Sequence, residues 1–168
     1  MAGKLIDIFQ NCKCVKEEKH LAAGEVRSLA FGDNNTVMVV ELGLHEVVSR
    51  KVIARAEKQI AEAGCRTRSD SVRVVEALVT ASPEFFKGKK KSEVKAYFQE
   101  ALGFIQEHQD PKTIISAVVH MDEKTPHMHL CFVPLTEDGR LSAKEIVGNK
   151  KKLTQWQDRF WEHMVKKY

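Results

Sequence analysis

The sequence contains few cysteines and no long apolar run, and both shortages exclude classes of protein. The four cysteines stand at positions 12, 14, 65 and 131, where they form neither a Cys-x-x-Cys pair nor a disulfide framework. This pattern favours the reducing cytoplasm. No run of about 18 apolar residues occurs, and residues 1–15 lack the uninterrupted apolar segment of a signal peptide. We therefore expect a soluble protein that is not exported.

The chain has little excess charge of either sign. Its 27 lysines and arginines only slightly outnumber its 23 acidic residues, so the composition permits a phosphate-bearing partner without requiring one. With 168 residues, 43% of them apolar, the chain has the size and composition of one globular domain. The expected fold is a single α/β or α+β core.

Apolar patterning predicts the elements of this core from residue 36 onward. Segments with the β-branched, apolar character of buried strands lie at 36–44, 72–81, 113–121 and 127–135. Helical spacing predicts helices at 45–63, ended by Gly64, and from an N-cap at Ser92 to about His108. Ser142 should cap a small helix, and a last helix carries Leu153, Trp156, Phe160 and Met164. Residues 1–44 give the weakest secondary-structure pattern of the chain, and we expect them to form an edge of the same domain.

The most informative stretch is HMDEKTPHMH at 120–129, which holds three histidines and two acids around a Thr-Pro pair. If the two strands that flank this turn pair antiparallel, His120 lies opposite His127 or His129. Side chains alternate along a strand with period two, so His127 and His129 share that face. Strand geometry therefore predicts that three imidazoles converge on one patch.

Two interpretations of this patch are open. A lone histidine on a strand is more often a packing or hydrogen-bonding residue than a ligand, which favours a histidine-rich polar turn. Three neutral imidazoles with open coordination positions are instead typical of a catalytic metal centre. Glu123 or Asp122 could add a ligand or a proton acceptor. All-nitrogen ligands favour manganese, zinc or another transition ion over magnesium, and such an ion would polarise a phosphoryl oxygen.

Four stretches of the chain carry a more specific signature. They are AVVHMDEKTPHMHLCFVP at 117–134, GRLSAKEIVG at 139–148, the aromatic helix LTQWQDRFWEHM, and RTRSDSVRVVEALVTASPEFF upstream. Together they closely resemble the plasmid mobilisation and recombination (Mob/Pre) relaxases, which belong to the HUH endonucleases. The resemblance covers about residues 45–168, and a motif of the form HxDExTPHxH is far more specific than a loose three-residue pattern.

The resemblance implies an α+β fold in which helices pack on a ferredoxin-like antiparallel sheet. It implies a metal-dependent, site- and strand-specific DNA nickase that acts on single-stranded or hairpin DNA at a plasmid transfer origin. Such enzymes form a covalent 5′-phosphoryl link to the protein, leave a free 3′ hydroxyl, and later rejoin the strand.

The resemblance also assigns roles to residues of the hairpin. By position, His120, His127 and His129 match the metal ligands, with a divalent ion as cofactor and manganese favoured over magnesium or zinc. Glu123 matches the motif glutamate, which implies a catalytic role as a fourth metal-site group or as the group that activates the nucleophile.

Basic residues are the candidates for phosphate contacts with such DNA. They are Arg66, Arg68, Arg73 and the lysines at 89–91 and 150–152, with Lys150 and Lys151 at the start of the last helix. Each of them, taken alone, also fits a solvated surface charge.

The departure from the family pattern lies near the N-terminus. Relatives carry a nucleophilic histidine in a His-x-x-Arg context, whereas the nearest counterpart, His20, stands in KHLAAGEVRS without an arginine three residues later. His20 in a divergent motif is one candidate nucleophile. The alternatives are a module that binds metal and DNA without strand transfer, and a hydrolase that uses metal-bound water. The abrupt end at Tyr168 suggests a fragment without its C-terminal continuation, and nothing indicates the oligomeric state.

Overall fold

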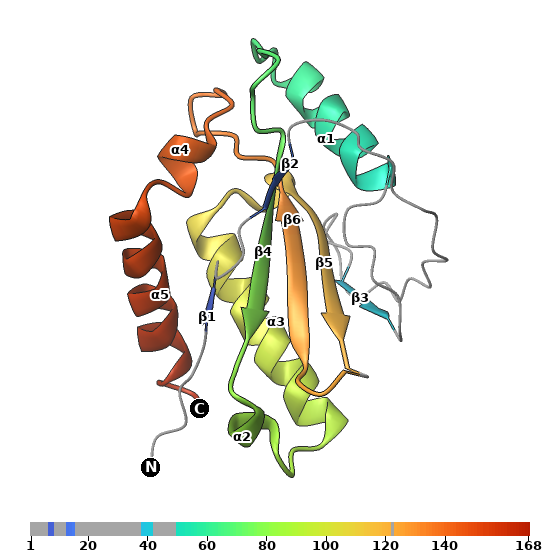
Figure 1. Cartoon of the computed structure of the whole chain (residues 1–168), viewed down its shortest axis with the longest axis vertical. Coiled ribbons are helices and arrows are strands. Elements are labelled where there is room, and N and C mark those ends of the chain that lie inside the picture. Colours follow the sequence, from blue (N-terminus) through green and yellow to red (C-terminus); the bar gives the residue numbers. More distant parts are fainter. Residues whose placement is uncertain (1–6, 9–12, 16–37, 42–49, 122) are drawn as a thin grey trace.

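One mixed β-sheet with helices on both faces forms the fold (Figure 1). The computed structural model describes residues 7–8, 13–15, 38–41, 50–121 and 123–168. Along the chain the elements are β1 (Asp7–Ile8), β2 (Lys13–Val15), β3 (Met38–Glu41), α1 (Arg50–Glu62), β4 (Val74–Thr80), α2 (Pro83–Phe86), α3 (Lys91–His108), β5 (Ile114–His120), β6 (His127–Phe132), α4 (Ala143–Ile146) and α5 (Lys150–Met164). None of the helices described is both long and apolar enough to cross a membrane.

Three antiparallel strands form the centre of the sheet, in the order β4-β6-β5. β1 and β2 both pair antiparallel with β4, whereas β3 pairs with the other side of β5 and runs parallel to it. The described parts of residues 1–44 therefore flank the central strands on both sides. The predicted α+β fold with an antiparallel sheet is confirmed for these central strands, and the parallel β3 makes the whole sheet mixed.

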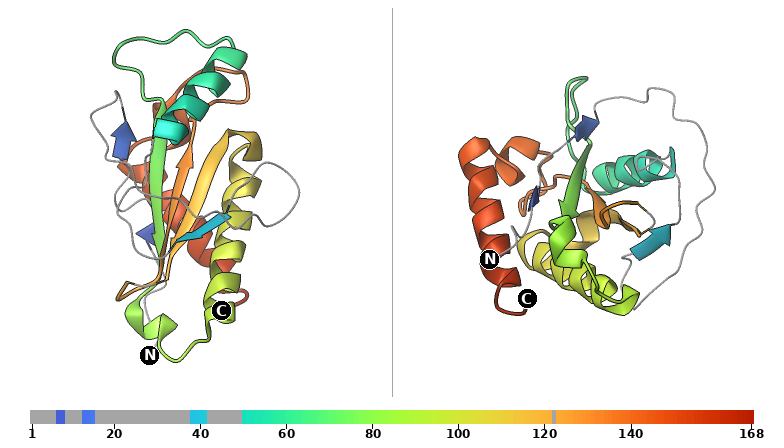
Figure 2. Two further views of the ribbon diagram at one scale, coloured as in Figure 1. Left: turned by 90° about the vertical axis from the view of Figure 1, so that its right-hand side faces the viewer. Right: turned by 60° about the horizontal axis from the view of Figure 1, so that its bottom comes forward.

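The main hydrophobic core lies between one face of the sheet and the helices α3 and α5 (Figures 1 and 2). Alternate residues of the central strands point into it, among them Ala77, Val79, Ala117, Met128 and Leu130. Helices α3 and α5 contact each other through Phe104 and Phe160, whose ring centroids are 5.3 Å apart. Since Met128 is fully buried here, the side chains of His127 and His129 point to the opposite face.

Helix α1 covers one end of that opposite face. Its apolar residues pack against the start of β4 and the far end of β6, in a cluster of Val52, Ile53, Ala56, Ile60, Val74, Ile115, Cys131 and Val133. Gly64 follows the helix with φ of 65°, as predicted for a glycine that ends a helix. The turn between β5 and β6 lies at the other end of the sheet, away from α1 (Figure 1).

A β-bulge in β5 decides which of its side chains reaches each face. The register between β5 and β6 shifts between Ile114 and Ser116, which makes Ile115 the extra residue. A shift of one residue moves every following side chain to the other face. The bulge thereby directs Val119 into the core beneath α3 and places His120 on the face that also carries His127.

Helix α3 begins earlier than the sequence indicates. The expectation that Ser92 caps it is wrong, because the helix starts at Lys91 with Lys90 as its N-cap. The carboxylate of Glu93 accepts a hydrogen bond of 2.7 Å from the backbone N–H of Lys90, which fixes this start. The predicted cap at Ser142 is confirmed, since its hydroxyl accepts from the N–H of Glu145.

The short helix α2 is an element that the sequence does not predict. It follows the end of β4, begins at Pro83, and is capped by Ser82, whose hydroxyl accepts a hydrogen bond of 3.3 Å from the N–H of Phe85. The side chain of Phe86 is buried in the main core, which anchors the helix beside the N-terminus of α3.

Candidate metal centre

The turn between β5 and β6 brings three histidines together at one end of the sheet. His120, the last residue of β5, pairs directly with His127, the first residue of β6, and His129 follows two positions later on the same face. Ring nitrogens from the three side chains all lie within 4.8 Å of one another, close enough for one ion to bind all three. The predicted convergence of three imidazoles on one patch is confirmed.

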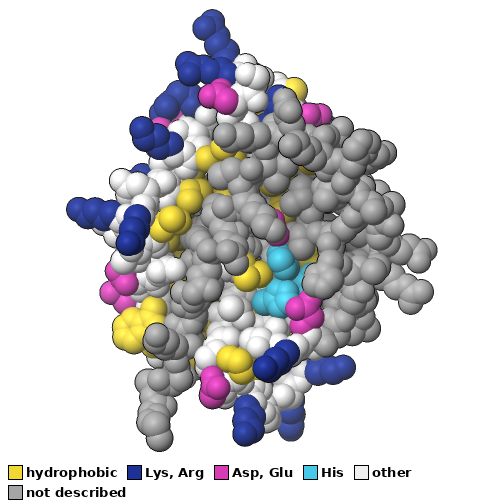
Figure 3. Space-filling view, in the orientation of Figure 1, with side chains coloured by type: hydrophobic (Ala, Val, Ile, Leu, Met, Phe, Trp, Pro, Cys, Tyr) yellow, Lys and Arg dark blue, Asp and Glu magenta, His cyan; other side chains and the backbone are white. Residues whose placement is uncertain are grey.

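The cluster is fixed by the sheet on one side and reaches the surface on the other. His120 is only 3% exposed, whereas the side chains of His127 and His129 are 14% and 20% exposed. Figure 3 shows histidine side chains at the surface, next to an acidic side chain, on the face seen in Figure 1. The sheet thus holds the rings while an approach from solvent remains.

Glu76 of β4 orients the ring of His129. Its Oε1 accepts a hydrogen bond of 2.8 Å from Nδ1 of His129. Leu78 is the direct partner of His129 in the β4–β6 register, so Glu76 is the diagonal neighbour on the same face. Because Nδ1 carries the proton in this bond, Nε2 keeps its lone pair for a metal ion.

A backbone carbonyl orients His127 in the same way. Its Nδ1 lies 3.0 Å from the carbonyl oxygen of Thr125, which can only accept, so Nδ1 is the protonated nitrogen and Nε2 is available. The turn itself is tied to β4, since the hydroxyl of Thr80 donates to the carbonyl of Pro126 at 2.8 Å. The hydroxyl of the buried Tyr97 donates in turn to the carbonyl of Thr80 at 3.2 Å.

Glu123, the predicted catalytic glutamate, lies beside the histidine cluster. Its Oε2 is 3.9 Å from Nε2 of His127, an ion-pair distance that is too long for a hydrogen bond. The side chain is 42% exposed on the turn, so it can approach a bound ion or accept a proton. Asp122, the other acid named from the sequence, lies outside the described residues.

Glu76 is the site residue that the motif does not reveal. A signal for it exists, because the strand sequence VVEALVT places one acid among apolar residues that are mostly buried. Glu76 is itself only 8% exposed, and a buried carboxylate almost always has a partner. The sequence can therefore indicate that Glu76 is paired, but the identity of its partner depends on the register between β4 and β6.

The donor atoms at this site fit a divalent transition ion. Three imidazoles supply neutral nitrogen ligands and leave coordination positions open for water or substrate. The carboxylates of Glu76 and Glu123 stand behind and beside these ligands, where their negative charge favours a bound cation.

Comparison with known proteins gives the chain its family. The family model for plasmid recombination enzymes, Mob_Pre, matches residues 45–168. The chain belongs to this family. The match has the same extent as the resemblance read from the hairpin and its neighbouring segments, so that prediction is confirmed.

Curated members of the Mob_Pre family are similar to this chain over part of their length. "Plasmid recombination enzyme type 1" of Staphylococcus aureus is 48% identical over 102 residues, which cover 61% of this chain and 25% of the relative. "Plasmid recombination enzyme" of Bacillus thuringiensis is 43% identical over 93 residues, which cover 55% of this chain and 21% of the relative. The chain thus spans about a quarter of the length of these curated relatives.

Solved Mob_Pre structures share the fold. A manganese-bound crystal structure of the MobM relaxase domain, in complex with oriT DNA of plasmid pMV158, matches with a TM-score of 0.63 and 26% identity. The match covers 68% of this chain and 61% of that one. A second complex of the MobM domain, with 26-nucleotide oriT DNA, gives a TM-score of 0.62 and 28% identity. This match covers 67% of this chain and 66% of the MobM chain.

Five of the predicted DNA-contact residues of this Mob_Pre domain do not gather at the metal centre: Arg66, Arg68, Arg73, Lys150 and Lys151. Arg66 and Arg68 are exposed on the loop between α1 and β4, and Arg73 is half-buried just before β4. Strands rise about 3.3 Å per residue, so the start of β4 lies roughly 20 Å from its histidine end. Lys150 and Lys151 are exposed at the start of α5. Contacts of these five residues with DNA stay a prediction.

His20, the candidate nucleophile, lies outside the described residues. Its role, like that of the three histidines as metal ligands and of Glu123 as a catalytic group, stays a prediction from the sequence.

Proposed function

We propose that this chain is the metal-binding part of a plasmid relaxase that nicks and rejoins one DNA strand at a transfer origin, in plasmid mobilisation or recombination. The observation that supports it best is the histidine cluster, in which two rings have Nδ1 engaged by acceptors and three nitrogens lie within 4.8 Å. Membership of the Mob_Pre family and the likeness to the MobM relaxase domain bound to oriT DNA support the same activity.

His120, His127 and His129 would hold one divalent ion, and manganese is the favoured species. The nitrogen ligands and the manganese-bound state of the MobM neighbour both support this choice over magnesium. When bound, the ion supplies Lewis-acid polarisation of a phosphoryl oxygen. Glu76 keeps His129 in the tautomer that presents Nε2.

Strand transfer requires a protein nucleophile, for which His20 is the proposed residue. Attack on the scissile phosphorus forms the bond to the protein and breaks the bond to the 3′ oxygen, which leaves as a hydroxyl once it takes up a proton. Attack by that hydroxyl reverses the step and rejoins the strand. Glu123, exposed beside His127, is suited to accept and return the proton.

The partner would be single-stranded or hairpin DNA, and the reaction would take place in the cytoplasm, where plasmids reside. Arg66, Arg68, Arg73, Lys150 and Lys151 would then contact phosphates away from the histidine end of the sheet.

Relaxation of supercoiled DNA tests the proposal. We expect the protein with Mn²⁺ to relax a plasmid that carries its cognate transfer origin, and His127→Ala to abolish that relaxation. His108→Ala removes an exposed histidine at the end of α3 and should leave the rate unchanged. Wild-type protein that never nicks such DNA, or a His127→Ala variant as active as wild type, would contradict the proposal.

A second candidate is a DNA-binding module that lacks strand-transfer activity. It is favoured by the absence of an arginine three residues after His20 and by the exposed arginines on the α1–β4 loop. It predicts salt-dependent binding to DNA without a covalent product. A denaturing gel of protein incubated with 5′-labelled and 3′-labelled origin oligonucleotides separates the two, because only a relaxase retains a labelled strand on the protein.

A further inference from the structure

A hollow of about 490 Å³ lies beside the metal centre, on the other side of the β5–β6 turn. Three segments meet around it: α2 with the loop that follows it, the first turns of α3, and the β5–β6 turn. Its lining residues are Pro83, Glu84, Phe86, Lys87, Lys89, Lys91, Val94, Met121, Lys124 and Pro126. We call it the lysine hollow.

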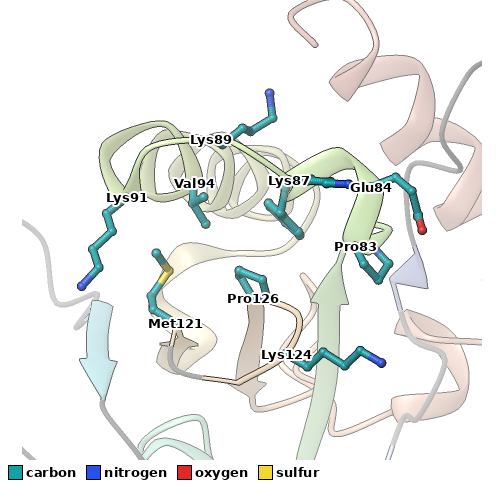
Figure 4. A pocket seen from close by; sticks show the side chains of 10 residues that line it. Pro83, Glu84, Lys87, Lys89, Lys91, Val94, Met121, Lys124 and Pro126 are labelled. Atoms are coloured by element: carbon teal, nitrogen blue, oxygen red, sulfur yellow. The ribbon is translucent and has the colours of Figure 1, made fainter.

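The lysine hollow has an apolar floor and a basic rim. Val94, Met121 and Pro126 point toward one another across its centre (Figure 4), and Phe86 and Val94 are buried at 7% and 4% exposure. The ammonium groups of Lys89, Lys91 and Lys124 point outward in different directions (Figure 4). A ligand that fits must therefore combine an apolar body with negative charge at its edges.

The charges on the rim are strongly one-sided. Among the described residues that line the hollow, four are lysines and one, Glu84, is an acid. Within the described part of the chain, no salt bridge engages any of these four lysines, in contrast to Lys58 and Lys167, which each pair with a glutamate. The Nζ of Lys89 lies 4.6 Å from the ring centroid of Phe85, which keeps this ammonium close to the protein surface. The rim is thus a cationic ring with little internal neutralisation.

The hollow and the metal centre share one turn. Met121 directly follows His120, and Pro126 directly precedes His127. The bond from Thr80 to the carbonyl of Pro126 holds this segment against β4, so the floor of the hollow and the histidine cluster are fixed relative to each other. A polymer that passes the histidines can reach the hollow by crossing the end of the sheet.

We propose that the lysine hollow binds one unstacked nucleotide of single-stranded DNA. The base covers the apolar floor formed by Val94, Met121 and Pro126, and the flanking phosphates pair with the rim lysines. Single-stranded DNA is the class of polymer with this chemistry, since its bases are apolar on their faces and carry a phosphate on each side. The proposal rests on the proposed function only in taking DNA as the partner, and it requires neither a metal ion nor strand transfer.

The salt dependence of binding tests the rim. The probe is a fluorescein-labelled oligothymidylate, with EDTA present so that no metal takes part. Each phosphate contact with a single strand contributes about 0.7 to the slope of log K against log salt. Because one nucleotide has two flanking phosphates, the triple variant Lys87→Gln, Lys89→Gln, Lys124→Gln should lower that slope by about 1.4. The charge-matched control Lys58→Gln, Lys112→Gln, Lys166→Gln changes exposed lysines elsewhere and should leave it within about 0.5 of wild type.

An abasic probe tests the floor. Oligothymidylates that lack one base but keep its phosphate should bind wild type several-fold more weakly at one position of the strand. Met121→Ala should also weaken the intact probe, and the two losses should not add, because both remove the same contact. Circular dichroism checks that Met121→Ala is folded.

Three results would overturn the proposal: equal salt slopes for the two triple variants, abasic losses that add to that of Met121→Ala, or a polyglutamate peptide that competes as well as the oligonucleotide. Competition by polyglutamate would show that the hollow recognises negative charge alone. Because EDTA is present, failure here leaves relaxation by wild type unaffected, and failure of relaxation leaves this binding intact. The two proposals are therefore separately testable.

Discussion

The Nδ1 of His129 on β6 lies 2.8 Å from Oε1 of Glu76 on the neighbouring strand β4. This bond joins two strands across one face of the sheet and fixes which nitrogen of His129 faces the other two histidines. It links the packing of the sheet to the chemistry of the candidate metal centre.

Glu76→Ala should weaken Mn²⁺ binding by about 10- to 100-fold, because the group that orients a metal-binding histidine is lost. Glu76→Gln should lose less, since its amide oxygen still accepts from Nδ1. Isothermal titration calorimetry measures both constants, with Glu107→Gln on the exposed side of α3 as control. Wild-type affinity in Glu76→Ala would show that the bond has no role in metal binding.

Thr80→Val should loosen the turn that carries His127, because it removes the hydroxyl that donates to the carbonyl of Pro126. We expect a loss of about 1 kcal/mol in unfolding free energy and weaker Mn²⁺ binding. Thr80→Ser keeps the donor and should bind Mn²⁺ like wild type. Equal affinity in the valine and serine variants would remove Thr80 from this role.

Phe160→Ala should destabilise the fold by about 3–5 kcal/mol, because it empties a fully buried position between α5 and α3. The next residue provides a matched control: Trp161 is 50% exposed, so Trp161→Ala should change the unfolding free energy by about 0.5 kcal/mol or less. Urea denaturation measures both. Similar losses in the two variants would contradict the packing of α5 on the sheet.

Glu100 should make stability depend on pH at the acidic end. Hydrogen bonds from Lys167, and then from His163, hold the pKa of its carboxyl below the ordinary 4.5. A depressed carboxyl pKa stabilises the fold at pH values above the ordinary range, and this contribution disappears as the pH falls through the folded value. Glu100→Gln should therefore show a shallower loss of stability from neutral pH to pH 3 than wild type.

Urea midpoints across that pH range measure the effect. Glu107→Gln, an exposed change on the same helix, should follow the wild-type curve. If Glu100→Gln and wild type lose stability in parallel, the pair between α3 and α5 does not contribute.

Much of the hairpin could be predicted from local sequence. Period-two alternation is enough to place His127 and His129 on one face and Met128 on the other, and the short turn makes His120 their neighbour. The bulge at Ile115 could not be predicted in this way. Ile114, Ile115 and Ser116 all suit a strand, and only the register with β6 shows that one of them is extra.

Long-range strand pairing also determines the partner of Glu76, which the sequence alone does not reveal. The contact between Glu76 and His129 spans 53 positions and follows from the register of β4 with β6, which no local pattern contains. The sequence mispredicts the start of α3 for a different reason. Ser92 is a strong N-cap type, but the carboxylate of Glu93 bonds to the backbone of Lys90 and fixes an earlier start.

The most direct test of the central claim is pulsed electron paramagnetic resonance of the protein loaded with one equivalent of Mn²⁺. If His120, His127 and His129 hold the ion, the spectrum should show nitrogen couplings from three imidazoles, and His129→Ala should remove one of them. A spectrum without imidazole nitrogen couplings, or one that His129→Ala leaves unchanged, would contradict the assignment of this cluster as the metal centre.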